Sequence, residues 1–138
     1  MNRVLDTLFD IYANEMEIAS ACYEMMGRLL DKKYVKERVE IAQLSDVYIY
    51  GGGYLGIQLY NSISQFTNVI DVVDRKGKLI LDICDIPVIS LEKFKCVYEG
   101  QMVVITPVKF YKSIYEELSK FIPEKKIIYL SELLGGIL

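Results

Sequence analysis

Three glycines, Gly51, Gly53 and Gly56, have the spacing G-x-G-x-x-G within the stretch VYIYGGGYLGIQLY. A β-prone run precedes them and a helical pattern follows, which is the context in which this spacing binds a dinucleotide pyrophosphate. The first glycine permits a tight turn, the second lets the backbone approach phosphate, and the third lets helix and strand pack closely. The predicted cofactor-binding turn consists of Gly51, Gly52, Gly53, Tyr54, Leu55 and Gly56.

Three further polar residues belong with this turn. Asp74 ends the next predicted strand, 23 residues after Gly51, where a carboxylate accepts hydrogen bonds from ribose hydroxyls. Arg75 follows at once, and its charge favours a phosphorylated ribose, so NAD and NADP are both candidate cofactors. Thr106 ends the strand expected beside the glycine turn, where it is either a ligand contact or a helix N-cap.

The alternative is that both segments are purely structural. Residues 51–56 would then form only a tight strand-to-helix turn, and residues 74–78 only a solvated β-turn. Folds of this kind also occur without the ligand that their motif suggests. The motif therefore predicts a nucleotide site and leaves the structural alternative open.

The sequence shows none of the common arrangements of catalytic residues. The chain has no histidine, which removes Ser/His and Cys/His pairs and histidine bases. No tyrosine has the Tyr-x-x-x-Lys spacing of short-chain dehydrogenases, and the acidic residues are dispersed. The three cysteines are far apart, so neither a zinc site nor a disulfide framework is indicated. We predict no catalytic residue and no metal site.

Two kinds of periodicity divide the chain. In residues 1–45 apolar residues recur every three and four positions, which predicts a helix over residues 2–30 and a second over 31–43, forming an antiparallel hairpin. From residue 46 strands alternate with helices, the pattern of a parallel sheet covered on both faces. Strands are expected at residues 47–50, 68–73, 87–89, 102–106 and 127–130. Between them we expect helices at residues 55–66 and 107–121 and a single helical turn at residues 91–94.

Right-handed crossovers then predict the strand order 3-2-1-4-5. The expected fold is thus α/β, a Rossmann-like three-layer parallel sheet of about five strands over residues 46–138, preceded by the N-terminal helical pair.

The composition of the chain limits the classes of binding partner that we expect. The 138 residues carry a net charge of −3 with no basic stripe, so a nucleic-acid partner is not expected. No leader pattern and no apolar run of spanning length is seen, so we expect a cytoplasmic protein without a membrane partner. The apolar face of the N-terminal helices is wide enough for a homodimer or for a partner protein.

A family resemblance rests on four segments: VYIYGGGYLG at residues 47–56, DVVDRKGK at 71–78, DIPVISLEKF at 85–94 and MVVITP at 102–107. Together they resemble the Rossmann-like nucleotide-binding domain of bacterial polysaccharide-biosynthesis proteins. The chain is similar to the N-terminal domain of nucleotide-sugar dehydratases and epimerases, and of sugar O-acyl and N-acetyltransferases. The resemblance implies binding of a nucleotide or nucleotide-sugar, with the chemistry in another domain.

The expected function is therefore a binding module for NAD(P) or a UDP-sugar-like ligand, linked to polysaccharide and surface-sugar biosynthesis and non-catalytic alone. One alternative is a small NAD(P)-dependent nucleotide-sugar dehydrogenase or epimerase completed by oligomerisation. A second is an S-adenosylmethionine methyltransferase, although the first strand lacks the usual acidic residue. A third is a purely structural role with the helical pair as the working surface.

Overall fold

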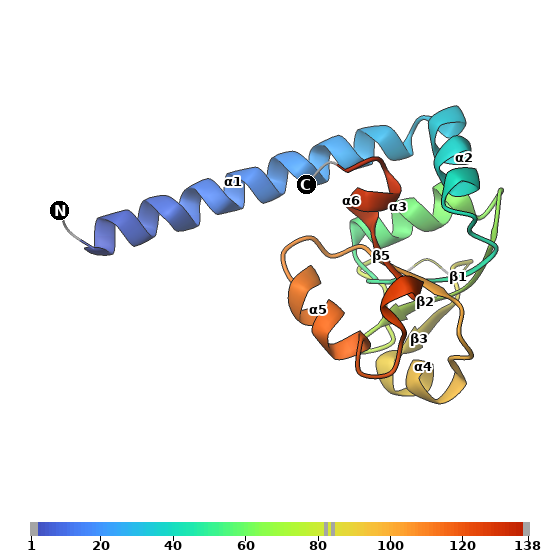
Figure 1. Cartoon of the computed structure of the whole chain (residues 1–138). Coiled ribbons are helices and arrows are strands. Elements are labelled where there is room, and N and C mark those ends of the chain that lie inside the picture. The colour runs from blue at the N-terminus through green and yellow to red at the C-terminus, as the bar shows by residue number, and fades with distance from the viewer. Residues whose placement is uncertain (1–2, 82, 84, 137–138) are drawn as a thin grey trace.

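The structure, a computed structural model, describes residues 3–81, 83 and 85–136, with side chains described from residue 16 onward (Figure 1). Its centre is a five-stranded parallel sheet in the order β3-β2-β1-β4-β5. The strands are β1 (Asp46–Tyr50), β2 (Asn68–Asp74), β3 (Val88–Ser90), β4 (Met102–Ile105) and β5 (Ile127–Tyr129). The predicted Rossmann-like α/β fold and its strand order are confirmed.

Helices cover both faces of this sheet. The strand β1 is central, and its residues from Val47 to Tyr50 are buried and alternate between the two faces. Val47 and Ile49 join the core shared with α3 (Tyr54–Ile63) and α6 (Leu130–Leu133). Tyr48 and Tyr50 join the core shared with α4 (Leu91–Val97) and α5 (Tyr111–Leu118). Burial of both faces explains why the strands read as almost continuous apolar runs.

Two N-terminal helices, α1 (Arg3–Leu29) and α2 (Lys32–Ile41), precede the sheet. The second half of α1 lies over α3, where Met25 and Leu29 are buried in the same core as Val47 and Ile49. The first half of α1 projects beyond the rest of the molecule (Figure 1). The helical pair therefore shares its core with the sheet, while one end of α1 extends away from it.

The N-terminal helices also hold the end of the chain. Leu134 O accepts hydrogen bonds from Arg28 Nη1 at 2.7 Å and from the Tyr34 hydroxyl at 2.5 Å. Arg38 Nε donates to Leu133 O at 2.7 Å, and Arg38 Nη2 donates to the Glu132 carbonyl at 3.3 Å. These three side chains satisfy carbonyls at the C-terminal end of α6, which an isolated helix leaves unpaired.

Several predicted boundaries were wrong, each for a local reason. The helix predicted from residue 107 begins at Tyr111, because Thr106 and Pro107 are held against the glycine turn after β1. The helix α4 runs to Val97 instead of making one turn; the Ser90 hydroxyl caps its start by accepting from Lys93 N at 3.2 Å, and Leu91 and Phe94 bury one face of it in the core. Leu130, predicted as strand, begins α6 after β5. The third strand begins at Val88, one residue later than predicted.

Candidate functional site

A hollow of about 360 Å³ opens at the carboxyl ends of β1, β2 and β4. It lies where the connections from the sheet leave in opposite directions, which is the usual ligand position in open α/β sheets. Its volume falls at the lower end of the range for small-molecule sites. Its lining residues are Tyr50, Gly51, Gly52, Gly53, Asp74, Arg75, Pro107, Phe110, Ser113 and Ile114.

Two glycines of the motif are required by the fold itself. Gly51 has φ +120°, and a Cβ there would lie 2.4 Å from Thr106 Oγ1. A Cβ at Gly56 would lie within bonding distance of the Gly51 carbonyl oxygen, so α3 can approach the end of β1 only through glycine. These positions form the tight turn and the close helix–strand contact predicted for the first and third glycines.

Gly52 is enclosed by the segment that follows β2. Its carbonyl accepts a hydrogen bond from Ile80 N at 2.7 Å, and a Cβ at Gly52 would lie 2.7 Å from the Lys78 carbonyl oxygen. The segment around residues 78–80 therefore packs directly on the glycine turn. This contact fixes the position of Gly52, which lines the hollow.

Gly53 differs from these three glycines. Its φ of −82° is accessible to every residue type, and a Cβ built on it meets nothing within 4 Å. It is the N-cap of α3, where serine or aspartate would stabilise the helix better than glycine, and no side chain caps this end. The fold therefore does not need glycine here, and the open space lies over the positive end of the α3 dipole.

Asp74 faces the glycine turn from the end of β2. Its Oδ2 accepts from the backbone N–H of Lys76 at 3.0 Å and of Lys78 at 3.5 Å, so the carboxylate stabilises its own turn. Its other oxygen, Oδ1, lies 3.1 Å from where a Cβ of Gly52 would be. Asp74 thus has a structural role and also presents an acceptor at the rim of the hollow.

Arg75 contributes positive charge to the same rim. Its Nη2 donates to Glu117 Oε2 at 2.8 Å, and Lys95 Nζ lies 4.0 Å from Glu117 Oε1. The Arg75 side chain is largely exposed, so this pair contributes little to stability and its guanidinium can be drawn to another anion.

Tyr50 forms the buried floor of the hollow. Burial raises the pKa of its phenol, and the nearby Arg75 guanidinium opposes that rise. The phenol is therefore protonated at neutral pH and can donate a hydrogen bond, but it is not a base. The exposed ring of Phe110 stands at the opening, and Ser113 follows on α5.

The sequence prediction did not include Tyr50, Phe110, Ser113 or Ile114. Tyr50 could have been found, because it ends β1 and must point to the opposite face from Ile49. The other three follow β4, and their position depends on the late start of α5, which has no local signal.

Four predicted site residues are not among those that line the hollow, and one of them is Gly56, which is buried where α3 meets the end of β1. Thr106 is buried and its hydroxyl donates to Tyr50 O at 2.8 Å, which ties the ends of β1 and β4 together. Tyr54 and Leu55 lie in the first turn of α3, where Tyr54 is exposed and Leu55 packs on the core. Thr106 therefore shapes the turn from behind, and Tyr54 and Leu55 lie beside the hollow.

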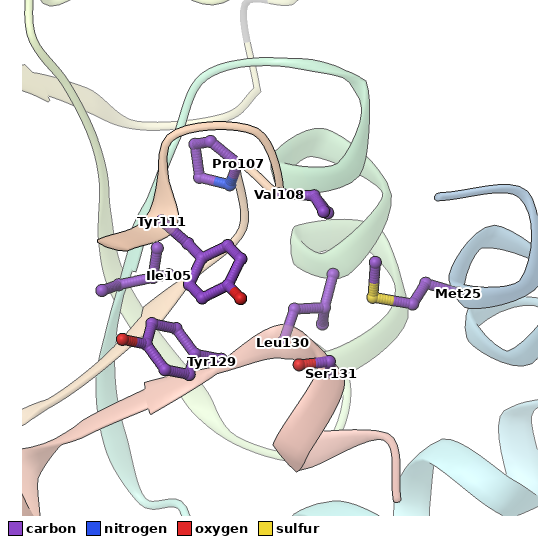
Figure 2. A pocket seen from close by; sticks show the side chains of 8 residues that line it. All are labelled: Met25, Ile105, Pro107, Val108, Tyr111, Tyr129, Leu130 and Ser131. Carbon is purple, nitrogen blue, oxygen red and sulfur yellow. The ribbon is translucent and has the colours of Figure 1, made fainter. Parts of the chain in front are cut away.

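A second cavity lies beyond Pro107, between α1 and the sheet (Figure 2). Its volume is about 10 Å³, which is room for about one water molecule. Mostly apolar and aromatic side chains line this cavity. The rings of Tyr111 and Tyr129 pack edge to face with centroids 4.7 Å apart. This cavity is a packing defect too small for an organic ligand.

The described residues form no group of three or more His, Cys, Asp or Glu side chains suited to a metal ion. In the same part of the chain, no helix has the length and apolarity needed to cross a membrane.

Comparisons with models of protein families, with curated proteins and with solved structures found no match to this sequence. The fold and the hollow define the class of protein, a Rossmann-like α/β domain with a crevice beside a glycine turn.

Proposed function

We propose that the crevice binds the phosphate groups of a nucleotide, such as NAD(P) or a nucleotide-sugar, and that the chain alone is a binding module. The observation that carries this proposal is the open space over Gly53 at the start of α3. Only glycine leaves that space free, and neither the backbone conformation nor the packing of the protein accounts for its presence. A phosphate group in close contact with the backbone would account for it.

The chemistry around this space suits a nucleotide. The first amides of α3 have no partner within the helix and point with its dipole toward the space, which favours phosphate. Asp74 offers a carboxylate oxygen to ribose hydroxyls, and the exposed ring of Phe110 offers a stacking surface for a base. Phosphate, sugar and base would each meet a group suited to it.

Arg75 bears on the choice between the two nicotinamide cofactors. Its guanidinium is held by Glu117 at 2.8 Å, in an exposed pair that a second phosphate can replace at little cost. Binding of NADP or of another ligand with an additional phosphate would exchange Glu117 for that phosphate. The Arg75→Ala variant should therefore weaken NADP binding more than NAD binding.

The proposal of a binding role without catalysis rests on the groups at the crevice. The phenol of Tyr50 stays protonated at neutral pH, Asp74 is engaged in its turn, and histidine is absent from the chain. The crevice therefore has no histidine base, and its buried phenol serves as a hydrogen-bond donor and not as a base. The wider role in surface-sugar biosynthesis is carried by the family resemblance of the four segments described above.

A thermal-shift panel tests the proposal. The purified protein is melted with NAD, NADP, UDP-glucose, coenzyme A and S-adenosylmethionine. A ligand specific for the folded state at about 100 times its dissociation constant adds ~2.7 kcal/mol to stability. We expect a shift with one nucleotide class that is reduced in Asp74→Asn. It should be unchanged in Asp46→Asn, whose carboxylate lies at the opposite end of β1. A panel without any shift would overturn the proposal.

A further inference from the structure

The helix α1 carries two apolar stripes, and only one of them is used by its own chain. Ala21, Met25 and Leu29 are buried against the sheet domain. On another side, Met16 and Tyr23 of α1, and Leu30 directly after its last residue, are 57%, 85% and 72% exposed. Three large apolar side chains along one line are more than the scattered exposure of an ordinary surface.

The exposed stripe has a strict seven-residue repeat. Its positions alternate in steps of three and four over nearly the whole helix, which is the a/d pattern of a coiled coil. In the sequence the same register continues to the start of α1, over the half that projects beyond the sheet domain (Figure 1). The stripe comprises Leu5, Phe9, Tyr12, Met16, Ala19, Tyr23, Met26 and Leu30.

We propose that this stripe is a dimer interface, in which α1 of one chain pairs with α1 of a second copy in antiparallel orientation. In the antiparallel register that opposes Met16 to Ala19 of the other copy, every stripe residue meets another stripe residue. Leu5 then opposes Leu30, Phe9 opposes Met26, and Tyr12 opposes Tyr23. No other partner is needed to complete the pattern.

Charge favours this orientation. The first half of α1, residues 3–17, has four carboxylates and one arginine, whereas residues 18–32, which oppose it in this register, have two acidic and two basic side chains. Antiparallel pairing therefore places the acidic half of each α1 along a segment without net charge, and parallel pairing would place acidic beside acidic. The same acidic half argues against an anionic membrane surface, since interfacial helices are rich in lysine and arginine.

The surface area that the stripe would bury is also large enough for a stable dimer. In the proposed pairing the three aromatic positions of the stripe would contribute roughly 600 Å², at about 200 Å² for each buried aromatic side chain. With the five smaller stripe residues the interface reaches the roughly 800 Å² per partner of a stable complex. The projecting half of α1, without a partner in its own chain in Figure 1, is thereby covered.

Sedimentation equilibrium of the full chain tests the dimer, with an expected mass of twice 15.9 kDa. The double variant Tyr23→Glu/Leu30→Glu should return the mass to that of one chain, because it places charge in the stripe. Both side chains are exposed in the monomer, so the fold and its circular dichroism should not change. Val97→Glu, a matched change at an exposed position on α4, should remain dimeric.

A spin label tests the orientation. With the native cysteines replaced, a label at Thr7 lies opposite residue 28 of the other copy in the proposed register. At 1.5 Å per residue the two labels of a dimer would be about 30 Å apart along the axis, whereas in a parallel pair they would have almost no axial separation and the total label distance would be shorter. A monomeric wild type, or a dimer insensitive to the glutamate variants, would overturn the interface. A short label distance would overturn the antiparallel pairing.

Discussion

Replacing Gly53 with aspartate should separate the stability of the protein from its ligand binding. Gly53 is the uncapped N-cap of α3, in an extended conformation that aspartate adopts readily. An aspartate there gains a few tenths of a kcal/mol as a better cap and about 0.3–1 kcal/mol from the helix dipole. At roughly 3–4 °C per kcal/mol for a chain of this length, the unliganded protein should melt about 2–4 °C higher.

Ligand binding should change in the opposite direction. The same carboxylate fills the space over the start of α3 and repels phosphate. A nucleotide at about 100 times its dissociation constant should raise the melting temperature of the wild type by roughly 9 °C, from ~2.7 kcal/mol. In Gly53→Asp this increment should vanish, and titration calorimetry should record no binding at the wild-type ligand concentration.

Gly53→Asn is the matched control, because asparagine caps as well as aspartate and carries no charge. Retained binding in Gly53→Asn would assign the loss to charge, and lost binding would assign it to volume. Unchanged nucleotide affinity in Gly53→Asp would refute a phosphate site at this position. A fall in the melting temperature of unliganded Gly53→Asp would show instead that the fold requires glycine there.

Three further variants test the surrounding structure. Gly51→Ala should lower the urea unfolding free energy by about 2 kcal/mol or more, because φ is +120° and the added methyl would lie 2.4 Å from the Thr106 hydroxyl oxygen; unchanged stability would contradict the close contact. Burial raises the pKa of Tyr50, so its contribution to stability is complete below its unfolded pKa of about 10 and is lost as pH rises through the higher folded pKa. Urea midpoints measured from pH 8 to 11 should therefore fall less steeply in Tyr50→Phe than in the wild type, and parallel curves would refute this. Tyr34→Phe should cost about 1 kcal/mol in chemical denaturation through the lost bond to Leu134 O, and a neutral result would show that Arg28 suffices.

The sheet could be predicted because its signals are local and repeated. Runs such as residues 102–105 are long enough to identify buried strands, and right-handed crossovers then restrict their order. The glycine turn could be predicted because the spacing of its glycines is local, and Gly56 is needed by its contact with the Gly51 carbonyl five residues earlier; the contact of Gly51 with Thr106 could not be predicted in this way.

Features that depend on tertiary contacts could not be predicted from the sequence. The start of α5 depends on Thr106 and Pro107 being held against Gly51, and without that contact proline at a first helical turn is a reasonable prediction. The four residues of α6 are too few to show a helical period. The residues of the two apolar stripes of α1 alternate along the sequence. The structure distinguishes the stripes, because Met25 is buried and Tyr23 is exposed.

The hydrogen bonds between the N-terminal helices and α6 also affect the order in which contacts form during folding. They join residues 94 to 106 positions apart, so they close loops almost as long as the chain. Loop-closure entropy delays such contacts relative to the neighbouring pairs of the sheet. During synthesis α1 and α2 emerge before their partners Leu133 and Leu134. Arg28, Tyr34 and Arg38 therefore stay without these carbonyl partners until synthesis has passed residue 134, whereas the apolar side of α1 can pack on α3 earlier.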